Sequence, residues 1–260
     1  MPALYANEDR TRRRSSALLS AKTAGRNLSD VVLGYVDAAN LPDAPVIVDV
    51  GCGQGRSSVR LARHHPNGVV LAVDSSLAMT TAVRVRAAGL NIQPITGDFH
   101  DLPLADGCAD LAAAIMCLYH SPTPHQVIVG IRRMLRRSGT AILVTKAADS
   151  YHELAELLER SGLDPDARSR PSLYETAHNG NLPYLAEAGG LTVRSVKHEV
   201  HTFTFGDLAD TAAYLATCPQ YALAGPLRKP DALAAALRTR VPDGPVTTTA
   251  TISYVVGEPA

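Results

Sequence analysis

A glycine-rich segment, Gly51-Cys52-Gly53-Gln54-Gly55, lies between a short apolar run and an amphipathic stretch. The apolar run 46–50 is typical of a buried strand, and the stretch 57–64 is typical of a helix. Glycines at this junction allow a sharp turn and a close approach of the backbone to a ligand, while the helix start offers free N–H groups. The segment therefore predicts a strand, a tight turn with a ligand site, and a helix.

Apolar runs and amphipathic stretches alternate along the following hundred residues. The predicted strands are 46–50, 69–73, 92–95, 111–115 and 141–145, and the predicted helices are 57–64, 76–88 and 126–135. Strands that alternate with helices form βαβ units, hence a mostly parallel sheet with helices on both faces. The pattern predicts an α/β fold with a Rossmann-like, doubly wound sheet.

The two ends of the chain have a different pattern. Helical periodicity covers 11–38 and 151–160, and two long alternating stretches, 191–205 and 247–256, predict late strands with helices between them. We expect one domain with an antiparallel last strand. Its predicted parts are an N-terminal helical lid (1–42), a ligand-binding core (43–160), and a substrate-side cap with the final strands (161–260).

The composition excludes several classes of protein. The 25 basic and 25 acidic side chains of the 260 residues balance, which gives no field that attracts nucleic acid. No stretch of 18 apolar residues predicts a membrane span, the first residues lack the apolar core of a signal peptide, and the four cysteines have no metal-ligand spacing. We expect a cytoplasmic protein with reduced thiols and no metal, acting as a monomer or homodimer. The arginine run 10–14 either binds phosphate or forms a solvated helix face.

Three carboxylates lie at or just after the ends of the first three predicted strands. Asp49 stands two residues before Gly51, and Asp74 follows about 25 residues later, where a carboxylate can accept both hydroxyls of a ribose. Asp98 and Phe99 follow the third strand and offer an acceptor and a ring to an adenine. Nucleotide folds that bind nicotinamide cofactors need a third glycine in GxGxxG, whereas Arg56 follows the glycines here.

These motifs resemble the class I S-adenosylmethionine-dependent methyltransferases, in particular small-molecule enzymes with a type 11 or type 25-like domain. The resemblance covers about 46–158 and includes DVGCGQG, GDFHDLPL, LYH and MLRRSGTAILVT. It implies S-adenosylmethionine as the cofactor. The cofactor-binding residues that it implies are Asp49, Gly51 and Gly53 for the methionine moiety, Asp74 for the ribose, Ser75 and Met79 after it, Asp98 and Phe99 for the adenine, and Met116 or Cys117 beside the sulfonium.

The tail of the fourth strand, Tyr119-His120, lies where the resemblance places the reacting groups. Ligands of such sheets bind beyond the carboxyl ends of the strands. His120 is a candidate general base, or it only shapes the loop; Tyr119 is a catalytic candidate or, more simply, a packing residue. The motif that accompanies methylation of DNA amino groups is absent, which disfavours a nucleic-acid substrate.

Two other segments are candidates for binding the substrate. Tyr5 belongs to an N-terminal segment that either folds over the cofactor or remains free. His178 and Asn179 occupy a loop where similar enzymes often carry Glu-Asn-Gly, so the histidine departs from that pattern.

Three functions remain open from the sequence. The first is methylation of a small-molecule biosynthetic intermediate, such as a specialised metabolite, by in-line displacement. The second is another displacement at the same sulfonium, for example cyclisation of the aminobutyrate chain to azetidine-2-carboxylate with release of methylthioadenosine. The third is a binding module that keeps the fold without catalysis.

Overall fold

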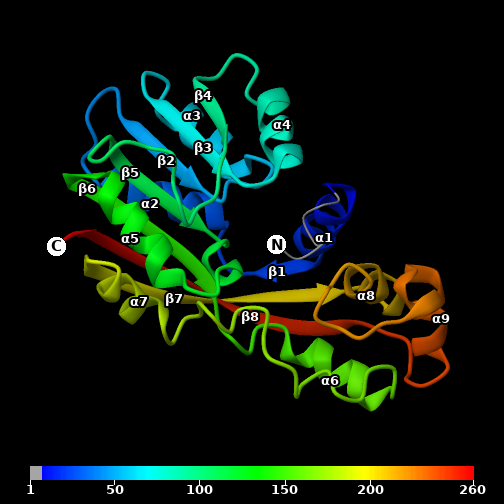
Figure 1. The fold of residues 1–260 in the computed structure, drawn as a ribbon. Helices are drawn as coiled ribbons and strands as arrows, with labels where there is room; N and C mark the ends of the chain where they lie inside the picture. Colours follow the sequence, from blue (N-terminus) through cyan, green and yellow to red (C-terminus); the bar gives the residue numbers. More distant parts are fainter. Residues whose placement is uncertain (1–7) are drawn as a thin grey trace. The chain divides into compact units, whose positions relative to one another are not determined.

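The computed structural model describes residues 8–260 (Figure 1). The chain divides into two compact units. Unit 1 comprises Met1–Gly25, Ala148–Leu173 and Glu199–Thr251, and unit 2 comprises Arg26–Ala147, Tyr174–His198 and Ile252–Ala260. Tyr5 lies outside the described residues.

Unit 2 contains the predicted succession of strands and helices. Its strands are β2 (Val46–Val50), β3 (Val69–Asp74), β4 (Ile92–Thr96), β5 (Ala109–Ile115) and β6 (Leu135–Lys146), with parts of β7 (Leu191–Phe205) and β8 (Val246–Pro259). Its helices are α2 (Leu28–Ala38), α3 (Arg56–His64), α4 (Leu77–Arg86), the 3-10 turn η1 (Leu118–His120), α5 (Pro124–Met134) and α7 (Leu182–Ala188).

The sheet of unit 2 has the strand order β7-β8-β6-β5-β2-β3-β4. Strands β2 to β6 run parallel, and β8 pairs antiparallel with β6 from Ala141↔Gly257 to Lys146↔Ile252. The chain winds outward from β2 through β3 to β4 and then resumes on the other side of β2 at β5. This arrangement confirms the doubly wound α/β fold and its antiparallel last strand.

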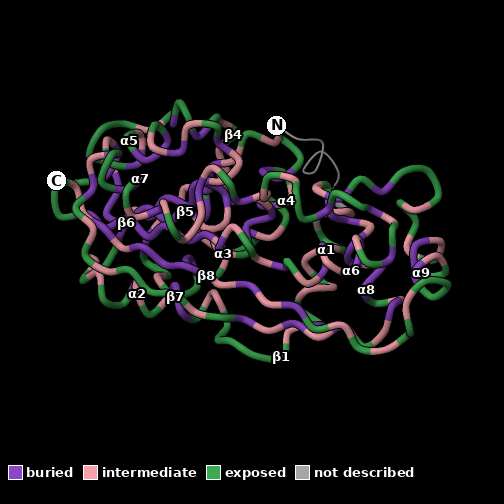
Figure 2. Tube along the Cα trace, turned by 90° about the horizontal axis from the view of Figure 1, so that it is seen from below, coloured by how far each residue is buried: buried purple, intermediate pink, exposed green. Residues whose placement is uncertain are grey.

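Apolar side chains cover both faces of this sheet, because successive residues of a strand point to opposite sides. Val48 packs in a cluster with α5 and α7, whereas its neighbour Ile47 packs in a second cluster with α2, α3 and α4. The tube of β5 and β6 is accordingly buried along most of its length (Figure 2). Helices on both sides thus hold the carboxyl ends of the strands in fixed positions.

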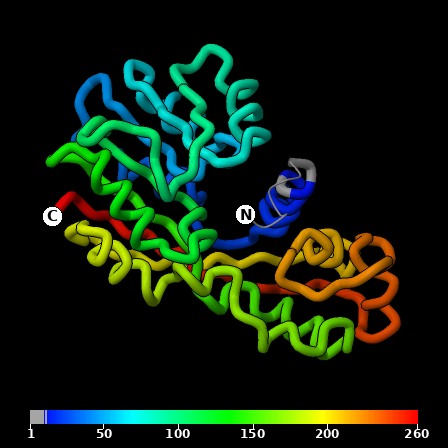
Figure 3. Tube along the Cα trace, viewed as in Figure 1, coloured from blue at the N-terminus to red at the C-terminus, as the bar shows by residue number. Residues whose placement is uncertain are grey.

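Unit 1 is assembled from three separate stretches of chain, which differ in colour in Figure 3. Its elements are α1 (Glu8–Ala21), β1 (Lys22–Ala24), α6 (His152–Arg160), α8 (Leu208–Leu215), the 3-10 turn η2 (Gly225–Arg228), α9 (Pro230–Arg238), and the remaining parts of β7 and β8. Strand β1 pairs antiparallel with β7, with Lys22 opposite Phe203.

Two side chains of the arginine run pack inside unit 1. The Arg10 Nε donates a hydrogen bond to the Thr217 carbonyl oxygen at 3.1 Å. The Arg14 guanidinium lies 6.0 Å from the centre of the Tyr214 ring, which stacks on Phe205 at 5.4 Å. These two arginines therefore contribute to a helix contact, since long basic side chains also bury apolar surface.

The predicted single helix over 11–38 is wrong. The structure has two helices, α1 and α2, with β1 between them. Gly25 adopts φ +94, a left-handed conformation that a helix excludes, and the Asn27 side chain accepts the Ser29 N–H at 2.9 Å to begin α2. The other predicted elements are present with shifted ends. The grouping of the chain into a lid, a core and a cap stays a prediction.

Within residues 8–260, no helix is both long and apolar enough to cross a membrane. The same residues contain no group of three His, Cys, Asp or Glu side chains with the geometry to hold a metal ion.

Candidate functional site

The loops that follow β2 and β5 meet at the point where the strand order reverses. Strands β2 and β5 are neighbours, yet β2 leads outward to β3 while β5 leads to β6 on the other side. Adjacent loops that diverge in this way leave a crevice at the carboxyl ends of the strands, where open α/β sheets bind their ligands. The glycine-rich segment 51–55 and the segment 116–121 are these two loops.

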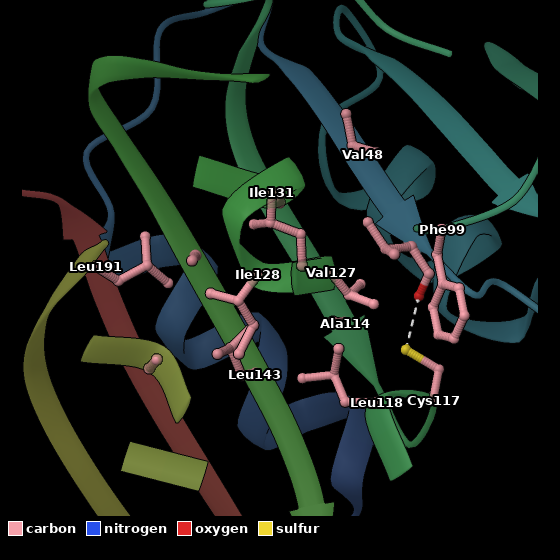
Figure 4. Packing of buried hydrophobic residues seen from close by; sticks show 14 of the residues in the cluster. Val48, Phe99, Ala114, Cys117, Leu118, Val127, Ile128, Ile131, Leu143 and Leu191 are labelled. Atoms are coloured by element: carbon pink, nitrogen blue, oxygen red, sulfur yellow. Dashed lines mark hydrogen bonds between the residues drawn. The ribbon is translucent and has the colours of Figure 1, made fainter. Parts of the chain in front are cut away.

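Gly51 lies directly against Cys117 of the second loop. A Cβ added at Gly51 would come within 2.5 Å of the Cys117 Cβ, and the backbone of Gly51 has φ +66. The Cys117 Sγ donates to the Val50 carbonyl oxygen at 3.1 Å, which joins the two loops, as the dashed line in Figure 4 shows. Burial raises the pKa of the Cys117 thiol, so that it remains a protonated donor. Only glycine fits at position 51.

Gly53 and Asp74 connect the first loop to the end of β3. The Gly53 N–H donates to Asp74 Oδ2 at 2.8 Å, and the Ser76 N–H donates to Asp74 Oδ1 at 2.9 Å. Both carboxylate oxygens are thereby oriented, and each keeps lone pairs for a further donor. A Cβ built on Gly53 would meet no atom within 4 Å. Asp74 therefore presents an oriented acceptor, and the space above Gly53 is open.

Asp49 lies beneath the same loop. Its side chain is buried, and the Ser58 hydroxyl of α3 donates to Asp49 Oδ2 at 2.6 Å. Burial, opposed by the Ser58 hydrogen bond and reinforced by the charge of Asp74, raises the pKa of Asp49 to about 7. The carboxyl thus changes its charge near neutral pH, directly below the glycine loop.

We expect Asp49→Asn to change how stability depends on pH. The folded pKa of about 7 lies above the unfolded value of 3.8, so the folded state retains a proton that the unfolded state loses as pH rises. Stability contributed by the protonated carboxyl is present below pH 3.8 and is lost as pH rises to about 7. At roughly 1.4 kcal/mol per pH unit, this loss approaches 4 kcal/mol in the wild-type protein.

Urea unfolding of the ligand-free protein at pH 4.5, 6 and 7.5 tests this expectation. The free energy of unfolding of Asp49→Asn, relative to wild type, should increase steadily with pH across these points. Asp106→Asn, at an exposed carboxyl, is the matched control and should show no such trend. A constant difference between Asp49→Asn and wild type at all three pH values would contradict the prediction.

Asp98 follows β4 and is exposed, with 62% of its side chain accessible. Its Oδ1 accepts the backbone N–H of His100 at 2.9 Å, and this bond is the main reason that the pKa of Asp98 lies below its usual value. Phe99, the next residue, is buried and packs in the same cluster as Cys117 (Figure 4). The structure therefore fixes an ionised acceptor beside an aromatic ring.

Ser75 and Met79 occupy different environments near the start of α4. Ser75 is exposed in the turn after β3, whereas Met79 is 1% exposed on the inner side of the helix. Ser76 caps the helix and accepts the Met79 N–H at 3.5 Å.

The second loop begins with a strained residue. Met116 has φ +56, in the left-handed region that a long side chain rarely adopts, and its N–H donates to the Val144 oxygen at 2.8 Å. Such conformations cost of order 1 kcal/mol or more and are concentrated at functional sites. The strain redirects the chain from β5 into η1, which carries Tyr119 and His120.

Tyr119 and His120 belong to an aromatic group at the ends of β5 and β6. The Tyr119 ring contacts the rings of His120 at 4.3 Å and Tyr174 at 4.8 Å, both edge-on. The Lys146 Nζ donates to the Tyr174 hydroxyl at 3.4 Å and lies 5.4 Å from the centre of that ring. The Thr176 hydroxyl donates to the Tyr119 carbonyl oxygen at 3.0 Å. Polar and aromatic groups are thus collected at this edge of the sheet.

The loop with His178 and Asn179 lies at the end of β6. The Asn179 N–H donates to the Lys146 carbonyl oxygen at 3.2 Å. The His178 N–H donates to Asn181 Oδ1 at 2.7 Å, and the His178 Nδ1 accepts the Gly180 N–H at 3.1 Å. This places the two predicted substrate-binding residues at the same edge of the sheet as Tyr119 and His120.

Several neighbours of the predicted site residues could not be recognised in the sequence. They are Ser58, His100, Ser121, Lys146 and Tyr174. For Ser58 the sequence offered only a weak signal of its contact with Asp49. A hydroxyl in the first helical turn after a glycine loop can donate back to the preceding strand. The others come together only through the packing of distant segments.

Comparison with known proteins agrees with this geometry. Residues 47–139 match the model of a family described as a methyltransferase domain. The malonyl-acyl-carrier-protein O-methyltransferase of Xylella fastidiosa is 30% identical over 129 residues, which are 49% of this chain and 44% of that protein. The chain spans less than half of the first curated relatives it matches, 36% and 44% of their lengths.

Solved structures share the fold at low sequence identity. The YcgJ protein of Bacillus subtilis has a TM-score of 0.61 at 14% identity, covering 88% of this chain and 97% of that one. The cyclase SpnF has a TM-score of 0.58 at 17% identity, covering 92% of this chain and 85% of that one.

Proposed function

We propose that this chain, whose residues 47–139 match the methyltransferase-domain model, transfers a methyl group from S-adenosylmethionine to a small-molecule acceptor. The observation that carries the proposal is that three features lie together at the carboxyl ends of β2, β3 and β5. Asp74 is oriented by two backbone N–H groups, Gly51 is pressed against Cys117, and the space above Gly53 is open.

The residues present suit this cofactor. Asp74 accepts the ribose hydroxyls, and Asp98 with Phe99 receives the adenine, because an ionised carboxylate and an aromatic ring match its amino group and its face. The backbone at Gly51 and Gly53, with Asp49 below, holds the methionine moiety. Met116 or Cys117 would lie beside the sulfonium. When bound, S-adenosylmethionine supplies an electrophilic methyl group on a cationic sulfur.

The chain contributes alignment of the reacting groups at the carboxyl ends of β2 and β5. The joined loops fix the direction from which an acceptor approaches, and alignment of reacting atoms accounts for a large share of the barrier to bimolecular displacement. Tyr119 and Tyr174 form an apolar wall with polar tips, and Asn179 stands at the same edge. His120 accepts the proton of an acceptor that must be deprotonated.

Incubation with methyl-labelled S-adenosylmethionine and candidate metabolites tests the proposal. Mass analysis should show S-adenosylhomocysteine together with an acceptor heavier by one methyl group. Absence of cofactor binding in calorimetry would contradict it and would favour a module that keeps only the fold.

A second displacement at the same sulfonium is the other candidate reaction for this site. Cyclisation of the aminobutyrate chain to azetidine-2-carboxylate requires no separate acceptor, and it releases methylthioadenosine instead of S-adenosylhomocysteine. The nucleoside product formed without any added acceptor therefore distinguishes the two reactions.

For His120→Ala we expect cofactor affinity within about twofold of wild type and turnover lower by roughly 10²-fold or more, as for the loss of a general base. His120 lies on η1, outside the glycine loop and the carboxylates that receive the cofactor. Calorimetry with S-adenosylhomocysteine and initial rates at saturating cofactor measure the two quantities. His152→Ala, at an exposed histidine of unit 1, is the control. Unchanged turnover in His120→Ala would exclude the role as base.

A further inference from the structure

We propose that His100 is a positioning residue, which orients the Asp98 carboxylate toward the 6-amino group of adenine and connects it to the loop after η1. The inference rests on the proposed function, since it concerns recognition of the same cofactor. His100 belongs to neither the glycine loop nor the group of acids, and its contacts alone suggest the role.

The two oxygens of Asp98 are not equivalent. Oδ1 accepts two hydrogen bonds from His100, one from the backbone N–H at 2.9 Å and one with the ring Nδ1 at 2.9 Å. Within residues 8–260, Asp98 Oδ2 accepts no hydrogen bond. One oxygen is therefore saturated and fixed, and the other is directed outward as an acceptor.

The other ring nitrogen of His100 is also held. Its Nε2 lies 2.8 Å from the hydroxyl oxygen of Ser121, which is buried and accepts the Thr123 N–H at 2.9 Å. A carboxylate can only accept, so in the neutral imidazole the hydrogen resides on Nδ1, and Ser121 donates to Nε2. The ring also packs edge-on against Phe99 at 4.6 Å. Three contacts thus fix both the tautomer and the orientation of His100.

This chain of bonds connects two parts of the candidate site. Asp98 follows β4, whereas Ser121 directly follows η1 and its residues Tyr119 and His120. Residues that hold another group in place are often needed as much as the groups that touch the ligand. His100 therefore fixes the adenine acceptor relative to the loop that carries the candidate base.

The 6-position of the purine gives a direct test. Adenine has an amino group there, which donates to a carboxylate, whereas hypoxanthine has an oxo group, which cannot donate. A site built to accept this hydrogen bond rejects the analogue that lacks it, because its carboxylate then faces another acceptor. The ratio of affinities for S-adenosylhomocysteine and S-inosylhomocysteine therefore reports on the orientation of Asp98.

The experiment is calorimetric titration of both nucleosides into wild type and three His100 variants. We expect wild type to prefer the adenine compound by about 10²-fold or more. His100→Asn places an amide N–H near the position of Nδ1 and should retain most of this ratio. His100→Gln and His100→Phe lack a donor at that position and should lower the ratio about 10-fold.

A set of outcomes overturns the inference. An unchanged ratio in His100→Phe, or an equal loss of affinity for both nucleosides in all three variants, would leave His100 with a structural role only. Asp98→Asn is the reference and should also lower the ratio; if it lowers the ratio while His100→Phe does not, Asp98 acts without His100. Failure of wild type to bind either nucleoside would overturn the proposed function together with this inference.

Discussion

Asp74→Ala should weaken binding of S-adenosylmethionine by at least about 100-fold, the largest effect of any single change in the cofactor site. Two hydroxyls that donate to a charged acceptor contribute about 1.5–3 kcal/mol each, and the variant loses both. The change also removes the acceptor of the Gly53 and Ser76 N–H groups, so the glycine loop loses its attachment to β3. Calorimetry with S-adenosylhomocysteine measures the loss.

Two variants make this result specific. Asp74→Asn retains one acceptor oxygen and the side-chain volume, so it should lose less affinity than Asp74→Ala. Asp106→Ala removes an exposed carboxylate, in a different loop, that is paired with Arg133 of α5. The affinity of this variant for the cofactor should equal that of wild type. Binding of Asp74→Ala within threefold of wild type would show that this carboxylate does not contact the cofactor.

Gly51→Ala should destabilise the protein by about 2–5 kcal/mol, the largest expected effect on stability. A left-handed backbone costs an alanine about 1–2 kcal/mol, and crowding of the new Cβ against Cys117 adds about 1–3 kcal/mol. Gly51→Val should be more severe, because a β-branched side chain is larger and stiffer. Urea unfolding of ligand-free protein measures the change, and loss of cofactor binding should accompany it.

Alanine variants at two further glycines distinguish the cost of backbone strain from the effects of crowding and of ligand contact. Gly53 and Gly107 both have positive φ, and an added Cβ would meet no atom within 4 Å at either position. Each alanine variant should lose only about 1–2 kcal/mol of stability. Gly53→Ala should also lose cofactor affinity, because its Cβ enters the open space, whereas Gly107→Ala should retain affinity. Equal stability losses at Gly51 and Gly107 would contradict the contribution of the Cys117 contact.

The sheet and the acids at its edge were predictable from local patterns. The run VIVDV followed by glycines predicts a strand and a turn without knowledge of any partner, and Asp74 and Asp98 end neighbouring strands for the same reason. Because parallel strands all end at one edge, an acid at each strand end implies a cluster of acids in space. Local rules therefore suffice for the positions of these carboxylates at the sheet edge.

Contacts between distant segments were not predictable. His100 meets Ser121 across 21 positions, and Lys146 meets Tyr174 across 28, in both cases through loops whose course depends on the packing around them. The break at Gly25 was missed because the residues on both sides have helical periodicity, whereas the positive φ of the glycine decides the outcome. Sequence periodicity reports which face is buried and says little about where two loops meet.

The pairing of β8 constrains how this protein can be made and shortened. Strand β8 lies between β6 and β7, although it comes last of the three in the chain. The sheet of unit 2 is therefore incomplete until Ile252–Ala260 have left the ribosome, and the exposed edges of β6 and β7 are open to wrong partners until then. Deletion of this segment should yield aggregated protein even though it removes no residue that is predicted to bind the cofactor.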